Sequence, residues 1–222
     1  KATVWLERFS TEKNELRFPA DPPEGPLKKA YQRYHDLLRE TGAMDLDDLI
    51  FWPVKFMESH PETAAVYRQK YRFVFVDEYQ DINLAQYRFL RALIGEETDF
   101  FAIGDPDQAI YGFRGAEVKF FLQFKNDFPT ANEIRLRQNY RSTVPIVESA
   151  QCLIRHNESH IANEIVSDVP GENIRTFEAA TEKAEEEFVV HTVEKLVGGT
   201  SHFSSDRDRV LAHAIQENGG KE

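Results

Sequence analysis

The sequence predicts an α/β fold in which a parallel sheet follows a helical N-terminal segment. Helical spacing of apolar residues dominates residues 1–70, whereas short β-branched and aromatic runs alternate with helical segments further on. Two of these runs, "RFVFV" (72–76) and "DFFAIGD" (99–105), flank a single helical segment. Strand, helix and strand in this order are typical of two parallel strands joined by a right-handed crossover.

The composition is that of an ordinary globular protein without a membrane span. The chain has 222 residues, 41% of them hydrophobic, which is enough for one large domain or two small ones. No apolar run reaches the roughly 18 residues that a membrane helix needs, and the start lacks the layout of a signal peptide. The single cysteine, Cys152, excludes an internal disulfide and fits a reducing compartment. We therefore expect a cytoplasmic protein without a membrane partner.

The net charge restricts how this chain can meet nucleic acid. A formal charge of −11 is unlike that of a protein whose whole surface contacts phosphate. The segment "RLRQNYR" (135–141), in contrast, carries three arginines and no acid. Any contact with nucleic acid is therefore expected to be local.

The first seventy residues predict a series of helices. The proline-rich loop "FPADPPEGP" (18–26) separates residues 1–17 from the next helical segment. Gly42 is placed to end that helix, and Pro53 is expected to kink or interrupt the one after it. The helices expected after the loop are 27–41, 44–60 and 61–71.

The remaining elements alternate between strand and helix. Because "RFVFV" has no polar alternation, it suits a strand that is covered on both faces. Gly198 and Gly199 are expected to stop the last helix. Further strands are expected at 99–105, 131–136 and 172–180, and helices at 84–94, 116–128, 144–157 and 181–199.

Acidic residues follow two neighbouring strands. Asp77 and Glu78 come after "RFVFV", and Asp105 follows the next strand. Ligands of parallel α/β sheets bind beyond the carboxyl ends of the strands, so these acids are expected to be neighbours at one edge. One carboxylate could hold magnesium on a phosphate and the adjacent one could activate water. Alternatively, the acids only end the strand and cap the next helix, which is favoured for an isolated "DE" pair.

Three motifs, in order, carry a family resemblance. They are "DEYQD" (77–81), "GDPDQAIYGFRGA" (104–116) and "RLRQNYRS" (135–142), with "STEKNEL" and "GAMDLDDLI" upstream. Together they resemble the second, third and fourth motifs of the UvrD/Rep-like superfamily 1 DNA helicases, over most of residues 8–160. The resemblance implies a parallel-sheet P-loop NTPase fold of the RecA-like type, with ATP and magnesium as cofactors.

The resemblance implies a role for each residue that would face the nucleotide. Asp77 would hold the magnesium of MgATP, and Glu78 would activate the hydrolytic water. Gln108 would contact the γ-phosphate and report its presence to the DNA site. Arg141 would act as an arginine finger, although alone it could be a surface arginine, and Tyr140 would stack on the adenine.

The same resemblance implies contacts with DNA and between motifs. Tyr111 and Phe113 would stack on single-stranded bases, with Phe113 at a position where relatives often carry tryptophan. Arg114 would brace their loop through a salt bridge. Gln80 and Asp81 would couple the first strand end to neighbouring motifs, or they could simply belong to the N-terminal region of a helix.

One expected motif is missing from the sequence. The phosphate-binding pattern GxxxxGK[ST] does not occur. We therefore interpret the chain as an internal fragment of a helicase, with an incomplete RecA-like fold, and expect negligible ATP hydrolysis from it alone. The expected divisions are the end of a helical insertion (1–70), the second half of the first RecA-like domain (71–140) and the beginning of the second (141–222).

The whole parent is expected to be an ATP-driven 3′–5′ DNA translocase acting in repair or replication. Its partners would be single-stranded DNA, duplex junctions and other repair or replication proteins. Two alternatives remain at this point: a helicase-like binding module that has lost catalysis, and the motor part of a helicase–nuclease. The residues before Lys1 in the parent gene would separate the first alternative from a motor, and the length of the parent beyond residue 222 would address the second.

Overall fold

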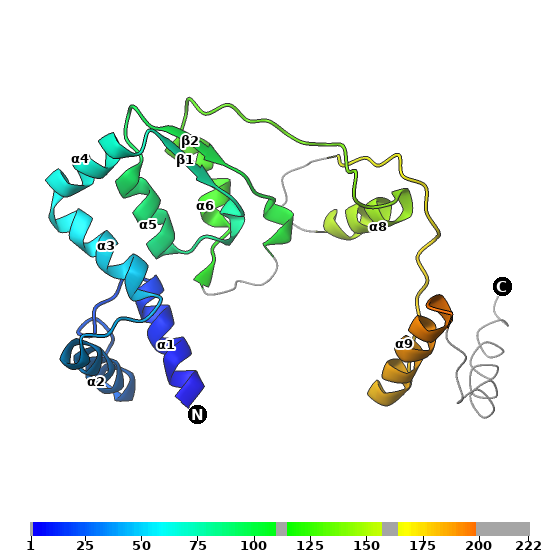
Figure 1. The fold of residues 1–222 in the computed structure, drawn as a ribbon, viewed down its shortest axis with the longest axis horizontal. Coiled ribbons are helices and arrows are strands. Elements are labelled where there is room, and N and C mark those ends of the chain that lie inside the picture. The colour runs from blue at the N-terminus through cyan, green and yellow to red at the C-terminus, as the bar shows by residue number, and fades with distance from the viewer. Residues whose placement is uncertain (1, 110–114, 157–163, 199–222) are drawn as a thin grey trace. The chain divides into compact units, whose positions relative to one another are not determined.

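A computed structural model describes residues 2–109, 115–156 and 164–198 (Figure 1). By its internal contacts the chain divides into two compact units, Lys1–Pro170 and Gly171–Glu222. Each unit is described by itself. None of the helices in the described ranges is long and apolar enough to cross a membrane.

The first part of unit 1 is helical, as its sequence predicts. Gly42, with φ of 64°, ends the second helix, and its N–H donates to the carbonyl oxygens of Leu38 and Arg39. Pro53 lies inside the third helix without interrupting it, and Pro61 starts the fourth. The four helices are α1 (Ala2–Asn14), α2 (Pro26–Thr41), α3 (Asp48–Ser59) and α4 (Pro61–Lys70).

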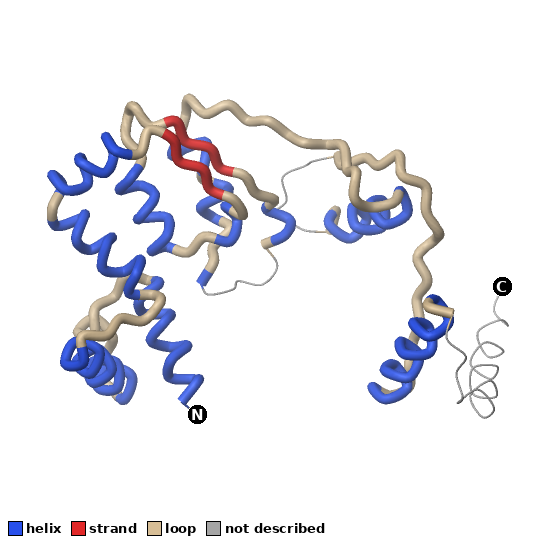
Figure 2. Tube along the Cα trace, in the orientation of Figure 1, coloured by secondary structure: helices blue, strands red, loops and turns tan. Residues whose placement is uncertain are grey.

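The α/β part of unit 1 is a strand, a helix and a second strand. β1 (Phe73–Val76) and β2 (Asp99–Ala102) are parallel, and α5 (Leu84–Leu93) connects them (Figure 2). The N-terminus of α5 is fixed by a capping box, in which the Asn83 side chain accepts the N–H of Gln86 and the Gln86 side chain accepts the N–H of Asn83. α5 also packs against α3 and α4. The α/β fold with a parallel sheet is therefore confirmed.

The two faces of the sheet are not equally covered. Val76, Phe100 and Ala102 pack against a buried cluster that includes Tyr79 and Phe120. On the other face the side chains of four residues are more than half exposed, so the expectation that this strand is covered on both faces is wrong within the described residues. These residues are Phe73, Phe75, Phe101 and Ile103.

The connections after β2 differ from the expected pattern. The helix expected at 116–128 is divided at Gln123 into α6 (Lys119–Leu122) and α7 (Phe124–Asp127). No strand forms at 131–136, where Ile134 and Leu136 are more than 80% exposed. A strand needs a partner for its backbone groups, and the only pairing found near it in the described chain is an isolated bridge between Gln138 and Val166.

The later helices are α8 (Val144–Ile154) in unit 1 and α9 (Glu182–Leu196) in unit 2. α9 starts where the Thr181 side chain accepts the N–H of Ala184, and Gly198 follows its end with φ of 75°. The strand expected at 172–180 is not formed. Its Phe177 instead stacks on Phe188 of α9, with ring centroids 3.7 Å apart, so this segment is held by a side-chain contact rather than a ladder.

A buried ion cluster joins the helices of the first part. The Lys13 ammonium lies 2.6 Å from Asp45 Oδ2 and 2.8 Å from Asp48 Oδ1, and the Lys13 side chain is 1% exposed. The Tyr34 hydroxyl donates to the same Asp45 oxygen at 2.8 Å. We call Lys13, Tyr34, Asp45 and Asp48 the lysine cluster. It ties α1 and α2 to the start of α3.

Candidate functional site

The first strand ends in a bulge that carries two acids. The N–H of Ile103 donates to Val76 O at 2.8 Å, and the N–H of Tyr79 donates to Ile103 O at 2.9 Å. In a regular parallel ladder the second bond would come from the residue two positions after Val76, which is Glu78. One extra residue is therefore inserted, and Glu78 adopts the left-handed conformation, with φ of 51° and ψ of 44°.

The bulge has a direct consequence for the adjacent acids. In a continuous strand, neighbouring side chains would point to opposite faces. Here Asp77 and Glu78 are both exposed, and the Glu78 N–H donates to Asp77 Oδ1 at 3.0 Å. A left-handed conformation costs a non-glycine residue of order 1 kcal/mol, and conformations of this kind cluster at functional sites, although Leu16 adopts one as well.

Behind these acids, Gln80 connects the two strand ends. Its side chain is 1% exposed. Its amide nitrogen donates to Glu78 Oε2 at 2.7 Å and to Asp81 Oδ2 at 3.4 Å, while its Oε1 accepts the N–H of Asp105 at 3.0 Å. These bonds confirm that the acids after the two strands are neighbours, as the strand order predicts.

The second strand end continues into a short turn that carries Gln108. Asp105 caps the 3-10 turn Pro106–Gln108 by accepting the N–H of Asp107 at 3.1 Å. Its other carboxylate oxygen accepts from Nε2 of Gln108 at 2.8 Å. Glu78, Gln80, Asp105 and Gln108 thus form one hydrogen-bonded series, which we call the strand-end chain. Two of its members, Glu78 and Gln108, are exposed to solvent.

Comparison with known proteins identifies the family of this site. The model of the UvrD/REP helicase N-terminal domain matches residues 4–129, and that of the UvrD-like helicase C-terminal domain matches residues 134–217. The chain belongs to the UvrD/REP helicase family. The curated ATP-dependent DNA helicase PcrA of Staphylococcus aureus is 36% identical over 200 residues, which are 86% of this chain and 27% of that protein. PcrA of Staphylococcus epidermidis gives the same values. The chain spans about a quarter of the length of these helicases.

The fourth helicase motif forms a turn of its own. Asn139 Oδ1 accepts the N–H groups of Arg141 and Ser142 at 2.9 and 2.8 Å. Tyr140 is 84% exposed and Arg141 is exposed as well. Within the described ranges, no hydrogen bond or ion pair joins either residue to Glu78 or Gln108. The structure therefore presents this helicase motif to solvent without bringing it to the strand-end chain.

Three predicted site residues of the third helicase motif lie outside the described ranges. They are Tyr111, Phe113 and Arg114, for which base stacking and bracing are expected from the resemblance. Their roles stay predictions.

The wall behind the site is hydrophobic and contains the buried phenol of Tyr79. Tyr79 is 1% exposed and its ring meets Phe100 and Phe124 edge to face. Burial, followed by the nearby Tyr87 and Asp127, raises the pKa of Tyr79 to about 12. The phenol is therefore neutral near pH 7, and the titratable groups at this edge are the carboxylates.

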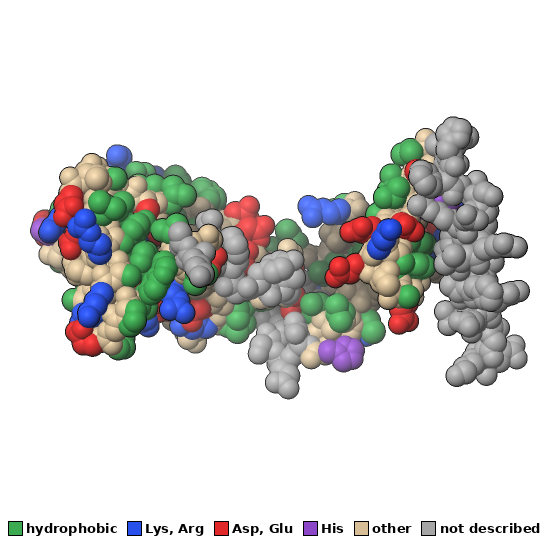
Figure 3. All heavy atoms as spheres, turned by 90° about the horizontal axis from the view of Figure 1, so that it is seen from below, with side chains coloured by type: hydrophobic (Ala, Val, Ile, Leu, Met, Phe, Trp, Pro, Cys, Tyr) green, Lys and Arg blue, Asp and Glu red, His purple; other side chains and the backbone are tan. Residues whose placement is uncertain are grey.

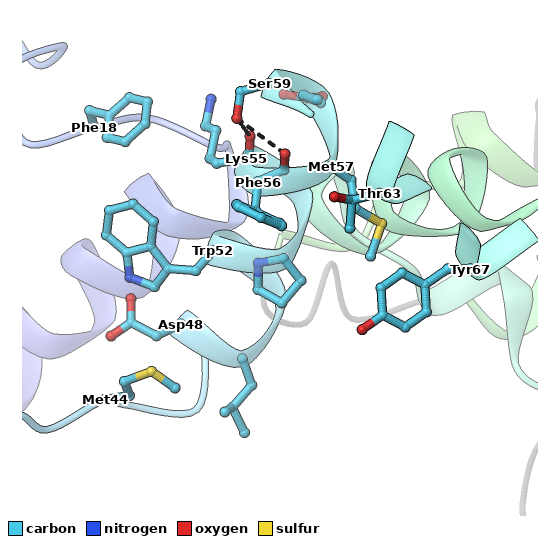
Figure 4. Close-up of a pocket in the computed structure, with 13 residues that line it drawn as sticks. Phe18, Met44, Asp48, Trp52, Lys55, Phe56, Met57, Ser59, Thr63 and Tyr67 are labelled. Atoms are coloured by element: carbon cyan, nitrogen blue, oxygen red, sulfur yellow. Dashed lines mark hydrogen bonds between the residues drawn. The ribbon is translucent and has the colours of Figure 1, made fainter. Parts of the chain in front are cut away.

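A separate groove lies on the helical part, away from the helicase motifs. It is lined by α3, α4 and the loops beside them, and encloses about 920 Å³ (Figure 4). Its lining is apolar and aromatic, including Trp52, Phe56 and Tyr67, and the Lys55 ammonium lies 4.8 Å from the centre of the Phe18 ring. None of the predicted site residues lines it. An open apolar groove is poorly suited to a triphosphate, so we place the candidate nucleotide site at the strand ends instead.

The charged side chains also bear on DNA binding. On the described part of the face drawn in Figure 3, lysines and arginines stand singly or in small groups among acidic and apolar residues. This distribution agrees with the net charge of −11 in favouring a local contact with nucleic acid.

Proposed function

We propose that this chain is part of the motor of an ATP-dependent DNA helicase that moves 3′ to 5′ along single-stranded DNA. Membership of the UvrD/REP family supports the proposal. The observation that carries it is the bulge at Asp77 and Glu78, which exposes two adjacent carboxylates beside Gln108 at the carboxyl ends of parallel strands.

Asp77 is the residue that fits magnesium. Its carboxylate is exposed, and Oδ1 is held by the N–H of Glu78. Magnesium is usually bound in proteins by one or two carboxylates, with waters and substrate phosphates completing the octahedron, so an exposed aspartate at a strand end suits it. When bound with ATP, the ion would offset negative charge that develops on the transferred phosphoryl group.

Glu78 is the residue that fits the activation of water. Gln80 holds one of its oxygens, Oε2, at 2.7 Å, which fixes the direction of the carboxylate and leaves the other oxygen to accept a proton. Gln108 would contact the γ-phosphate from the second strand end. Arg141 would supply a positive charge to it, and the exposed ring of Tyr140 would stack on the adenine.

The proposal includes a longer parent polypeptide. The chain has no GxxxxGK[ST] pattern and covers 27% of the PcrA sequence, so the phosphate-binding loop would come from elsewhere in the parent. We accordingly propose the division at residues 70 and 140 into a helical insertion and parts of two RecA-like domains. Single-stranded DNA, duplex junctions and repair or replication proteins would be partners of the parent.

The substitution Glu78→Gln, which replaces one carboxylate oxygen with an amide nitrogen, tests the proposal. In the longer helicase polypeptide, Glu78→Gln should lower the kcat of DNA-stimulated ATP hydrolysis by about 100-fold or more, because a general base contributes about that much. Binding of a fluorescent ATP analogue should change little. Steady-state hydrolysis with single-stranded DNA and equilibrium titration measure the two effects.

Glu96→Gln is the matched control, because Glu96 is an exposed acid between α5 and β2. It should leave kcat unchanged. Near-normal turnover by the Glu78 variant would remove Glu78 from the reaction. Robust, Glu78-dependent turnover by the 222-residue chain alone would overturn the proposal that the phosphate loop comes from elsewhere. A longer polypeptide that binds DNA without any turnover would favour the binding module instead.

A further inference from the structure

Gly104 leaves room for the side chain of Gln80. A Cβ atom at Gly104 would lie 2.5 Å from Gln80 Oε1, 2.9 Å from Phe121 Cε2 and 3.1 Å from the backbone nitrogen of Tyr79. Real Cβ atoms essentially never approach another heavy atom below 3.0 Å. The backbone of Gly104 is not left-handed, so its glycine is explained by the space that the Gln80 amide, the nearest group, occupies together with the Phe121 ring and the Tyr79 backbone.

The amide of Gln80 uses both of its ends in this space. Oε1 accepts the N–H of Asp105, directly after Gly104, at 3.0 Å, and Nε2 donates to Glu78 Oε2 at 2.7 Å. A fully buried amide needs partners for both atoms, because an unsatisfied one costs about 1–3 kcal/mol. Gln80 therefore has one position in which both needs are met, and in that position it holds Glu78.

The same tie reaches the turn that carries Gln108. Asp105, whose backbone is held by Gln80, accepts from Nε2 of Gln108 at 2.8 Å. Glu78, at the other end, has a left-handed backbone conformation. Without a restraint, a glutamate would relax to a more favourable conformation. Restraint at both ends of the strand-end chain depends on the contact between Gln80 and Gly104.

We propose that Gln80 and Gly104 act together as positioning residues, which fix the direction of the Glu78 carboxylate and tie it to the turn of Gln108. Because the Gln80 amide fills the space beside Gly104, it fixes the Glu78 carboxylate and the turn of Gln108 together. A displacement of either strand end would therefore displace the other. The inference rests on the proposed ATPase function for its catalytic meaning, whereas the tie itself is a property of this chain.

The tie is tested first in the 222-residue chain, by amide hydrogen exchange. Gln80→Met keeps the length of the side chain and removes both polar atoms, so the N–H of Asp105 should exchange about tenfold faster or more. Gln32→Met is the matched control, because the exposed amide of Gln32 also donates to a carboxylate, Asp36 Oδ1, at 3.1 Å. Unchanged exchange in the methionine variant would overturn the tie.

The catalytic consequence is tested in the longer polypeptide. Gln80→Met loses the donor to Glu78, so it should lower kcat about 10- to 100-fold while KM for ATP changes less than about threefold. A purely structural role of Gln80 would instead lower the amount of folded protein without a selective fall in kcat per folded molecule. Normal kcat per folded molecule in Gln80→Met would therefore overturn the positioning of Glu78.

Gly104→Ala supplies an independent route to the same effect. The new methyl group should displace the Gln80 amide and lower kcat to a similar extent, with little further loss when Gln80→Met is added. Additive losses would show that the two residues act separately and would overturn their joint action. If the unaltered longer polypeptide does not hydrolyse ATP, the proposed function fails, while the exchange experiment still decides whether the tie exists.

Discussion

Two polar side chains of this protein, those of Lys13 and Gln80, are buried to the same degree, but their polar contacts lead to different places. Each side chain is 1% exposed. In the lysine cluster, the Lys13 ammonium meets the buried Asp48 and the partly buried Asp45 between three helical segments. From Gln80, the bonds lead outward to the exposed Glu78 carboxylate. Burial alone therefore does not separate a structural polar group from a functional one, whereas the place where its bonds end does.

The two groups also differ in what their burial costs. A buried ion pair must recover a desolvation penalty of several kcal/mol for each ion, so the lysine cluster depends on keeping all of its partners. Burying a neutral amide such as that of Gln80 costs much less, and the amide needs only one acceptor and one donor. The lysine cluster is therefore expected to dominate stability and the strand-end chain to dominate activity.

The largest effect on stability should come from breaking the lysine cluster. Asp48→Ala removes one of the two carboxylates from a fully buried ammonium and should cost about 3 kcal/mol of unfolding free energy. Urea unfolding of the chain measures it. Lys13→Met combined with Asp48→Leu should cost less than Asp48→Ala, because the only charge of the cluster that it leaves behind is that of Asp45, whose side chain is 25% exposed. If Asp48→Ala lost under about 1 kcal/mol of unfolding free energy, the lysine cluster would not dominate the stability of the protein.

A smaller effect should appear in acid. Burial opposes the charge of Asp45, but hydrogen bonds from Lys13, the Asp48 N–H and Tyr34 outweigh it and lower the pKa of Asp45. Because the folded-state pKa lies below the unfolded one, the stabilisation is complete above about pH 4 and is lost as the pH falls through the folded-state value. The difference in urea midpoint between the native chain and Asp45→Asn should therefore shrink from pH 7 to pH 3. A constant difference would contradict this assignment.

The smallest effect should come from the bulge. Glu78→Gly is expected to be more stable than Glu78→Ala by about 1 kcal/mol, because both variants lose the bond to Gln80 and only glycine relieves the left-handed conformation. Thermal and urea unfolding of both variants measure the difference. Equal losses would show that Glu78 stores no strain and would weaken the contrast between the two groups.

Local signals in the sequence were sufficient for the helices of the first part, although not for the helix expected at 116–128, which is divided at Gln123. Gly42 and Pro61 mark a helix end and a helix start because their backbone preferences act within a few residues. The strands expected at 131–136 and 172–180 were wrong, because a strand also needs a neighbouring strand, and apolar alternation does not supply one. The covered second face of the sheet was wrong for a related reason, since covering depends on distant elements.

The candidate site was predictable to the level of strand ends. Asp77, Glu78 and Asp105 follow directly from where two runs of β-branched and aromatic residues stop. The inserted residue at Glu78 was not predictable, because the bulge is defined by which backbone groups pair across the strands. The space beside Gly104 was equally hidden, since it is filled by a residue 24 positions earlier, Gln80.

The contact at Gly104 constrains how this sequence can diverge. A lineage that acquires any larger residue at position 104 would meet the Gln80 amide at once, whereas one that first shortens position 80 removes the shortest of the three contacts and leaves those with Phe121 and Tyr79. The order of the two substitutions therefore changes how strongly the intermediate protein is disturbed. Among descendants of such a sequence, the identities at these two positions should be inherited as a pair, although 23 residues separate them in the chain.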